Sequence, residues 1–364
     1  MEFKIAVFAG DGIGPEVMEA CLPVLRALEE RVGGFQLALD PVAGGAAHYV
    51  ASGTALPDES VRAAEAADAI LFGAMGMPDV RQEDGTEVAP LLTLRRVLDL
   101  YAGVRPVKSY PNAPGPLADP RAQQIDLVVL RESTEGLFAS HGKGVVIEDR
   151  EARDTMVITR RTCERLFRFA FDLARKRKAK GLPGKVTCVD KSNVFRSLAF
   201  FRKIFDECAA RYPDVPADHA YVDATALNMV RRPWDLDVLV MENMFGDILS
   251  DLAGGIVGGM GMAPCAEVGD RHALFQPTHG SAPDIAGKGL ANPIAMFLSA
   301  AMMLEWLGER SGTQACLEAA RLLETSIERG FNGGRIRPPE FGGRDTTSRI
   351  AATVIEGIAT GERR

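Results

Sequence analysis

Short apolar runs alternate with amphipathic stretches along most of the chain, and this alternation is the strongest constraint on its fold. Strand-like runs at 4–8, 69–72 and 125–130 are separated by glycine-rich turns and by stretches with a helical period. Strands and helices that alternate in this way indicate an α/β fold. The chain has 364 residues, which is long for one well-filled core, so we expect two lobes.

Composition narrows the class of protein. The formal net charge is −7, which argues against a surface for nucleic acid or for an anionic membrane. The basic run at 175–180 ends a predicted helix, where cations are favourable, and we interpret it as a solvated cap. No stretch reaches the roughly 18 apolar residues of a spanning helix, and no cleavage-site pattern follows the first apolar run. Six scattered cysteines without CxxC spacing indicate reduced thiols, so we expect a cytoplasmic protein.

The segment 240–259, VMENMFGDILSDLAGGIVGG, places two carboxylates on one face of a predicted helix. Asp247 and Asp251 are four residues apart, and no Lys or Arg lies within one turn to neutralise them. Unpaired like charges at this spacing cost about 0.2–0.5 kcal/mol. A divalent cation would turn that cost into a gain, because Mg²⁺ and Mn²⁺ prefer carboxylate oxygens. An exposed, hydrated pair without a metal is the commoner meaning of an isolated DxxxD.

Three arginines, Arg95, Arg105 and Arg131, each stand at the end of a predicted element. A guanidinium matches a carboxylate in a two-point contact. If the three converge, they predict a ligand with more than one carboxylate. Taken singly, each arginine is more often a surface residue.

Lys191 and Asp223 each follow a buried-looking strand. The carboxyl ends of strands in open α/β sheets face the ligand crevice. A lysine beside a metal can have its pKa lowered enough to act as a base. A salt bridge to Asp190, or a simple solvent-facing position, is the alternative for this lysine.

Seven motifs occur in one order: GDGIGPEV, LLTLRR with a later VRP, RESTEG, DKSNV, YVDA, MFGDILSDLAGG and HGSAPDIAGKGLANP. Together they resemble the metal-dependent β-decarboxylating dehydrogenases that act on isopropylmalate, isocitrate, homoisocitrate or tartrate, nearest the isopropylmalate branch. The motifs span nearly the whole chain, and the last is close to diagnostic of that family.

The resemblance implies an isopropylmalate/isocitrate dehydrogenase-like two-domain fold with a large mixed sheet. A discontinuous cofactor-binding domain would comprise 1–100 plus 255–364. A substrate and dimerisation domain would comprise 101–254, with an arm at about 139–158 that clasps a partner. The implied assembly is a homodimer whose active sites are shared between subunits.

The resemblance also implies roles for the residues singled out above. Asp247 and Asp251 of one chain, with Asp223 of the other, would hold Mg²⁺ or Mn²⁺. Lys191 from the partner chain would be the base, and the bound metal would acidify the substrate hydroxyl and stabilise the enolate left by loss of CO₂. The residues that would bind the malate carboxylates are Arg95, Arg105 and Arg131.

The final motif is implied to bind the cofactor. Asn292 would contact the adenine, and Asp284 would accept hydrogen bonds from both ribose hydroxyls. A carboxylate at that position would repel a 2′-phosphate, so we expect NAD. The residues that would contact the adenosine and phosphate portion are His279, Gly280, Ser281 and Ala282.

The segment before Arg95 bears on substrate choice. Isocitrate enzymes place a Ser and an Asn there to meet a third carboxylate, whereas this chain has Ala89 and Leu91, with Leu92 beside them. A bare carboxylate against leucines would go unpaired. We therefore expect an alkyl substituent, with 3-isopropylmalate as the best guess.

Two departures from the family pattern keep other activities open. Phe138 stands where the family usually has a tyrosine that shuttles a proton, and Gln276 stands where a glutamate is expected near the nicotinamide. Water, His141 or Ser140 could replace the tyrosine. The alternatives are a tartrate, D-malate or isocitrate dehydrogenase, or a catalytically impaired regulatory paralogue that binds NAD and metal.

Overall fold

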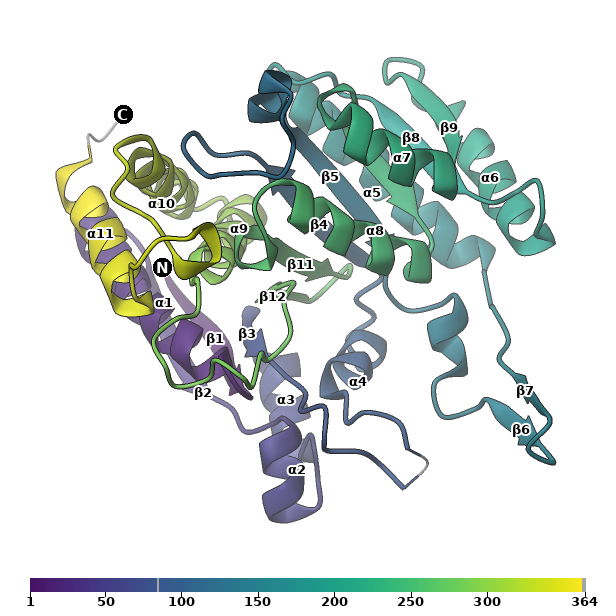
Figure 1. Cartoon of the computed structure of the whole chain (residues 1–364), viewed down its shortest axis with the longest axis horizontal. Helices are drawn as coiled ribbons and strands as arrows, with labels where there is room; N and C mark the ends of the chain where they lie inside the picture. The colour runs from purple at the N-terminus through teal and green to yellow at the C-terminus, as the bar shows by residue number, and fades with distance from the viewer. Residues whose placement is uncertain (84, 362–364) are drawn as a thin grey trace.

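The computed structural model describes residues 1–83 and 85–361, and it confirms the α/β fold with a ten-stranded mixed sheet and helices on both faces (Figure 1). In order across the sheet, the strands are β2 (Gln36–Pro41), β1 (Glu2–Gly10), β3 (Ala69–Ala74), β12 (Ala273–Pro277), β11 (Pro264–Val268), β4 (Ala102–Lys108), β5 (Asp126–Glu132), β10 (Val238–Met241), β8 (Val186–Asp190) and β9 (Ala217–Tyr221). The four strands at each end run parallel within their group. The two central strands, β11 and β4, run antiparallel to both of their neighbours.

Helices cover the two faces in different ways. On one face lie α1 (Gly14–Val32), α5 (Arg160–Ala179), α6 (Arg196–Ala209) and α9 (Ile294–Ser311), with α10 (Gln314–Asn332) and α11 (Thr347–Thr360) packed outside α1 and α9. On the other lie α3 (Asp58–Ala66), α4 (Pro90–Val97), α7 (Val222–Arg231) and α8 (Asn243–Ile256), with α2 (Ala46–Ser52) beyond α3 (Figure 1). Short 3₁₀ helices complete the set: η1 (Pro120–Gln124), η2 (Leu137–Ser140), η3 (Pro233–Asp235), η4 (Met260–Met262) and η5 (Pro339–Phe341).

The hydrophobic core is continuous on one face of the sheet and divided on the other. Under α1, α9, α5 and α6, one cluster of buried apolar side chains runs across the whole sheet. On the opposite face, one cluster lies beneath α7 and α8, and a separate one lies beneath α3 and α4. The divided face therefore leaves room for polar groups between α4 and α8.

Local sequence explains the elements that border this division. β3 and β10 are apolar at every position and fully buried, as expected of parallel strands covered on both faces. α8 begins where the side chain of Glu242 accepts hydrogen bonds from the backbone N–H groups of Met244 and Phe245. Such a cap satisfies donors that the first helical turn leaves free.

A small hairpin projects from the body of the protein. β6 (Val145–Ile147) pairs with β7 (Glu151–Arg153), and all six residues are exposed (Figure 1). The hairpin falls inside the arm predicted at 139–158. Its contact with a partner stays a prediction, as do the domain boundaries 1–100 plus 255–364 and 101–254.

All six cysteines are buried and free of disulfides. Within 1–83 and 85–361, none of the helices combines the length and the apolar character needed to cross a membrane.

The basic run at 175–180 is only partly the solvated cap that its sequence indicates. Arg177 is buried, and its Nε donates to Asp237 Oδ1 at 2.5 Å while its Nη1 donates to Asp126 Oδ1 at 3.0 Å. Asp237 is itself buried. The interpretation as a solvated cap is therefore wrong for Arg177, which closes a buried ion pair between α5 and the sheet.

We expect Arg177→Ala to lower the free energy of unfolding by about 3–5 kcal/mol, because it leaves a buried carboxylate without its partner. The matched control is Lys176→Ala, which breaks an exposed pair with Glu309 and should cost about 1 kcal/mol or less. Chemical denaturation of both variants measures the difference. Equal losses would contradict the buried role of Arg177.

Candidate active site

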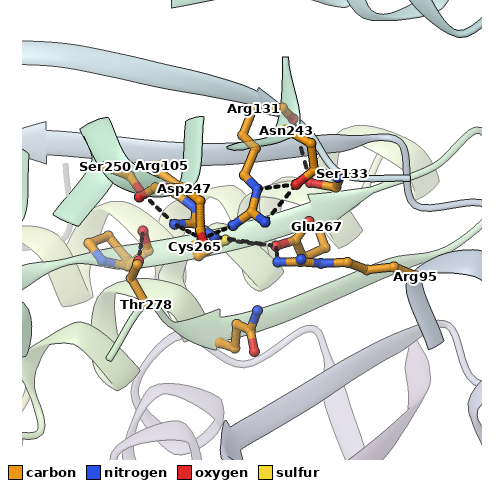
Figure 2. Close-up of polar contacts among 12 residues, drawn as sticks. Arg95, Arg105, Arg131, Ser133, Asn243, Asp247, Ser250, Cys265, Glu267 and Thr278 are labelled. Carbon is orange, nitrogen blue, oxygen red and sulfur yellow. Dashed lines mark hydrogen bonds and ion pairs between the residues drawn. The ribbon is translucent and has the colours of Figure 1, made fainter. Parts of the chain in front are cut away.

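A polar cavity of about 380 Å³ opens between α4 and α8, on the face where the core is divided. Its lining comes from β3, α4, β4, β5, η2, α8 and the loop after β12. Arginine and aspartate side chains gather on the side of the central strands (Figure 2). The cavity thus joins segments that are far apart in the sequence.

The three arginines singled out in the sequence converge on this cavity. Arg95 comes from α4, Arg105 from β4 and Arg131 from the end of β5, and each is almost fully buried. Figure 2 shows their guanidinium groups turned toward one another. A buried set of three cations can bind a small ligand that carries several carboxylates.

Arg131 is the most firmly held of the three. Its Nε and Nη2 donate to Asn243 Oδ1 at 2.9 and 2.6 Å, and its Nη1 pairs with Asp247. The guanidinium also lies 5.0 Å from the centre of the Phe138 ring, an arrangement in which ring and cation attract. Burial and the nearby charges of the other two arginines lower the pKa of Arg131 to about 9.

The two aspartates of α8 both line the cavity. Asp247 pairs with Arg131, and its Oδ1 lies 3.9 Å from Arg105 Nη1. Burial and the neighbouring Asp247 raise the pKa of Asp251, although Arg105 acts in the opposite direction. Cations from β4 and β5, rather than from the helix itself, therefore neutralise part of this pair.

Asp247 and Asp251 are two carboxylates of the cavity that could ligate a metal ion. Among the described residues, no three His, Cys, Asp or Glu side chains gather closely enough to hold an ion. Asp223 does not line the cavity; it pairs instead with Lys191 of the same chain. The carboxylates of Asp247 and Asp251 remain open to the cavity and are the kind of ligand that Mg²⁺ and Mn²⁺ prefer.

Lys191 and Asp223 do not line the cavity, and both side chains are partly exposed. The Asp223 side chain is 66% exposed and that of Lys191 27%. Asp190, the alternative partner for Lys191, pairs with Arg202 instead. Large apolar side chains are left exposed in the loop that follows Lys191, on α7 and on α8, and these are Val194, Phe195, Leu227, Val230 and Ile248.

Sequence reasoning missed Glu267, a carboxylate on the central strand β11. It is fully buried, pairs with Arg95, and its Oε1 lies 4.0 Å from Arg105 Nη2 (Figure 2). Burial opposes its ionisation, but the three arginines prevail and lower its pKa to about 2. The signal was present in the run PCAEV, because a charged residue in an otherwise apolar central strand needs a partner.

One part of the cavity lining forms an apolar wall. Leu91 lines the cavity together with Ala89 and Leu92, as the sequence indicates for the substrate side. Phe138 lines it too, and its phenyl ring has no proton to donate. Further apolar lining comes from Phe72, Met75, Val88 and Pro90.

The residues considered as substitutes for a tyrosine do not reach the cavity. Ser140 donates its hydroxyl to the carbonyl of Thr155 at 2.9 Å and accepts from the N–H of Thr155 at 2.8 Å. His141 is exposed, and neither side chain is part of the lining. Gln276, which stands in place of the expected glutamate, does line the cavity and is buried on β12.

The loop after β12 carries the residues implied to bind the cofactor. His279 and Gly280 line the cavity, and Asp284 is exposed. Burial lowers the pKa of His279, whose Nδ1 hydrogen-bonds to the carbonyl of Gly280 while its Nε2 has no partner among the described residues. Asn292 is buried and donates to Glu340 at 3.0 Å, so its amide is already engaged.

The first glycine-rich turn packs against this same loop. Gly12 has a φ of +56°, and a Cβ there would lie 2.0 Å from the carbonyl oxygen of Ser281. The N–H of Ile13 donates to that oxygen at 2.8 Å, and the Ser281 hydroxyl donates to the carbonyl of Gly76. GDGIGPEV is therefore a buttress that positions the loop at 279–282, including Ala282 with its φ of +36°.

The buried cluster of arginines and carboxylates, set beside apolar side chains on one face of an α/β sheet, is suited to a small anionic ligand. Comparisons with known proteins identify the family. The family model for isocitrate/isopropylmalate dehydrogenase matches residues 4–354, and the chain belongs to that family. It is therefore a member of a group of decarboxylating dehydrogenases.

Relatives and solved structures agree over nearly the full length. The 3-isopropylmalate/3-methylmalate dehydrogenase of Methanocaldococcus jannaschii is 43% identical over 98% of both chains. The 3-isopropylmalate dehydrogenase of Aquifex aeolicus is 42% identical over 93% of this chain and 91% of its own. The crystal structure of isocitrate dehydrogenase from Methylococcus capsulatus superposes with a TM-score of 0.85 at 37% identity, covering 98% of this chain and 99% of that one.

We expect Gly12→Ala to destabilise the protein by more than the about 1–2 kcal/mol of left-handed backbone strain, because the new methyl group would also collide with Ser281. Gly53→Ala is the control: its φ of +77° imposes similar strain, but nothing lies within 4 Å of the added atom. Thermal unfolding of both variants provides the measurement. A Gly12 variant no less stable than the control would show that the buttress contact is unimportant.

Proposed function

We propose that this protein oxidises and decarboxylates a 2-hydroxy-3-carboxy acid, with NAD as oxidant and Mg²⁺ or Mn²⁺ as cofactor. The observation that carries the proposal is the convergence of Arg95, Arg105 and Arg131 with Asp247 and Asp251 in one cavity. Three guanidiniums suit a polycarboxylate, and two adjacent carboxylates suit a divalent cation. The best single substrate is 3-isopropylmalate, because Leu91 and its neighbours form an apolar wall and the names of the relatives agree.

Different residues of the chain bind the substrate, hold the metal and accept the proton in the proposed reaction. The arginines bind and orient the substrate carboxylates, and the apolar wall shields the reacting carbons from water. Asp247 and Asp251, with Asp223 of a second subunit, would hold the divalent ion. When bound, that ion lowers the pKa of the substrate hydroxyl and stabilises negative charge on its oxygen. Lys191 of the second subunit takes the hydroxyl proton.

NAD is the proposed oxidant because of the loop after β12. Asp284 is exposed on that loop and can accept hydrogen bonds from ribose hydroxyls. The same carboxylate would repel a 2′-phosphate. His279, Gly280, Ser281 and Ala282 would meet the adenosine and phosphates, and Asn292 the adenine.

The proposed homodimer rests on the surface around Lys191. Phe195 in the loop after β8, Leu227 on α7 and Ile248 on α8 are large apolar side chains left exposed, and α7 packs against α8. Exposed apolar side chains that gather on neighbouring elements mark a protein contact. Pairing of two copies through this surface is the arrangement in which Lys191 and Asp223 would complete the partner's cavity.

Mixing two inactive variants tests shared sites. We expect Lys191→Ala and Asp251→Ala each to lose nearly all activity, and their mixture, after subunit exchange, to recover about a quarter of it, because half the dimers are mixed and one of their two sites is intact. Steady-state assays after refolding the variants together measure this. A mixture as inactive as its components would contradict sites built from two subunits.

Phe138 favours a second candidate, a regulatory paralogue with little activity of its own, since the cavity holds a ring that cannot deliver a proton. NADH absorbance with Mg²⁺ or Mn²⁺ across isopropylmalate, isocitrate, D-malate and tartrate separates the two. We expect turnover of isopropylmalate, and a rise in kcat of about tenfold or more for Phe138→Tyr with little change in KM, because a phenol supplies the missing proton. No turnover with any of the four by either protein would favour the paralogue.

A further inference from the structure

Glu267 places a permanent carboxylate inside the arginine cluster. It is fully buried and lies behind the guanidiniums, because Arg95, Arg105 and Arg131 line the cavity whereas Glu267 does not. Its carboxylate pairs directly with Arg95. Cys265 Sγ lies 3.5 Å from Glu267 Oε1, and burial raises the pKa of that thiol to about 12, so the sulfur stays protonated and donates.

The central strands of the sheet leave space for the Glu267 side chain. Gly103 on β4 stands directly opposite Glu267 on β11 and, on its other side, opposite Arg131 on β5. A Cβ at Gly103 would lie 3.2 Å from Glu267 Oε2 and 2.8 Å from the Ser133 hydroxyl. The glycine thus leaves space in the central strands for a buried carboxylate and a buried guanidinium on the same level.

The charge around the cavity then favours a particular class of ligand. Three guanidiniums face it, and one equivalent of their charge is neutralised by Glu267. Glu87 also lines the cavity, but Arg81 Nη1 lies 3.5 Å from its carboxylate and balances its negative charge. Asp247 pairs with Arg131 in this structure, but in the proposed function the two charges of the divalent ion balance Asp247 and Asp251. Two positive charges are left for the substrate, and they match two carboxylates.

We propose that Glu267 restricts this site to dicarboxylates, by occupying the guanidinium capacity that a third substrate carboxylate would require. The inference rests on the proposed function, since it assumes that the arginine cavity binds the substrate. The apolar wall acts in the same direction, because a third carboxylate directed at Leu91 would find no partner. Glu267 is a specificity-determining residue that acts through Arg95 and Arg105 and does not itself touch the substrate.

A purely structural role for Glu267 is the competing explanation. Three buried cations without a counter-charge would repel one another, so loss of Glu267 would also cost stability. Stability alone therefore decides nothing. The ratio of affinities for a tricarboxylate and a dicarboxylate decides, because a general loosening of the fold would weaken both.

The experiment is calorimetric binding of isocitrate and isopropylmalate, without NAD so that neither is consumed, to the wild-type protein, Glu267→Gln and Glu267→Asp. We expect the wild type to prefer isopropylmalate by at least about tenfold and Glu267→Gln to shift the ratio toward isocitrate by about tenfold or more, whereas Glu267→Asp keeps the wild-type preference. Asp237→Asn, which removes a buried carboxylate far from the cavity, is the matched control and should leave the ratio unchanged.

The possible results test the role of Glu267 and the dehydrogenase proposal separately. An unchanged ratio in a folded Glu267→Gln variant overturns the role of Glu267, and so does a wild type that binds both acids equally, even if the variant fails to fold. A shifted ratio in a protein that turns over none of the four hydroxy acids would reject the dehydrogenase proposal and leave the role of Glu267 intact.

Discussion

The central constraint on this structure is the repulsion among three guanidinium groups held out of water. Arg95, Arg105 and Arg131 are each almost fully buried, and like charges brought together in a medium of low polarity are costly. Burial, together with the charges of Arg95 and Arg105, lowers the pKa of Arg131. The cluster persists because carboxylates meet it from two directions, Glu267 from within the sheet and Asp247 from α8.

The topology of the sheet brings the Glu267 carboxylate close to the arginines. β11 and β4 run antiparallel at the centre of a sheet that is parallel on either side, so residues from distant parts of the chain become direct neighbours. Glu267 thereby faces Gly103, and Gly103 faces Arg131. A bulky side chain at Gly103 would take the space that the buried side chains of Glu267 and Arg131 occupy on either side of it.

The uneven distribution of apolar side chains explains why the site lies where it does. One face has a continuous core that joins the two ends of the sheet, and this gives the strands a common rigid support. The other face has two separate cores, and polar groups occupy the interval between α4 and α8. The site is thus open to ligand on one face and backed by close packing on the other, which is a common arrangement for precise binding.

Much of this protein could be predicted from its sequence. The alternation of apolar runs and helical periods determined the α/β class, because each element carries its own periodicity. The spacing of Asp247 and Asp251 placed both on one face of α8, since four residues make nearly one helical turn. The ordered motifs identified the family, as the comparisons confirm. These features are local, or are carried by short contiguous segments.

Tertiary structure alone decided which charges meet and which are buried. Glu267 is a single letter in an apolar run, and its partner Arg95 lies 172 residues away. Arg177 looks like its exposed neighbours until the packing of α5 turns it toward Asp237. Lys191 and Asp223 pair with each other and do not line the cavity. Burial and pairing depend on contacts between segments far apart in the chain, and local periodicity carries no information about those contacts.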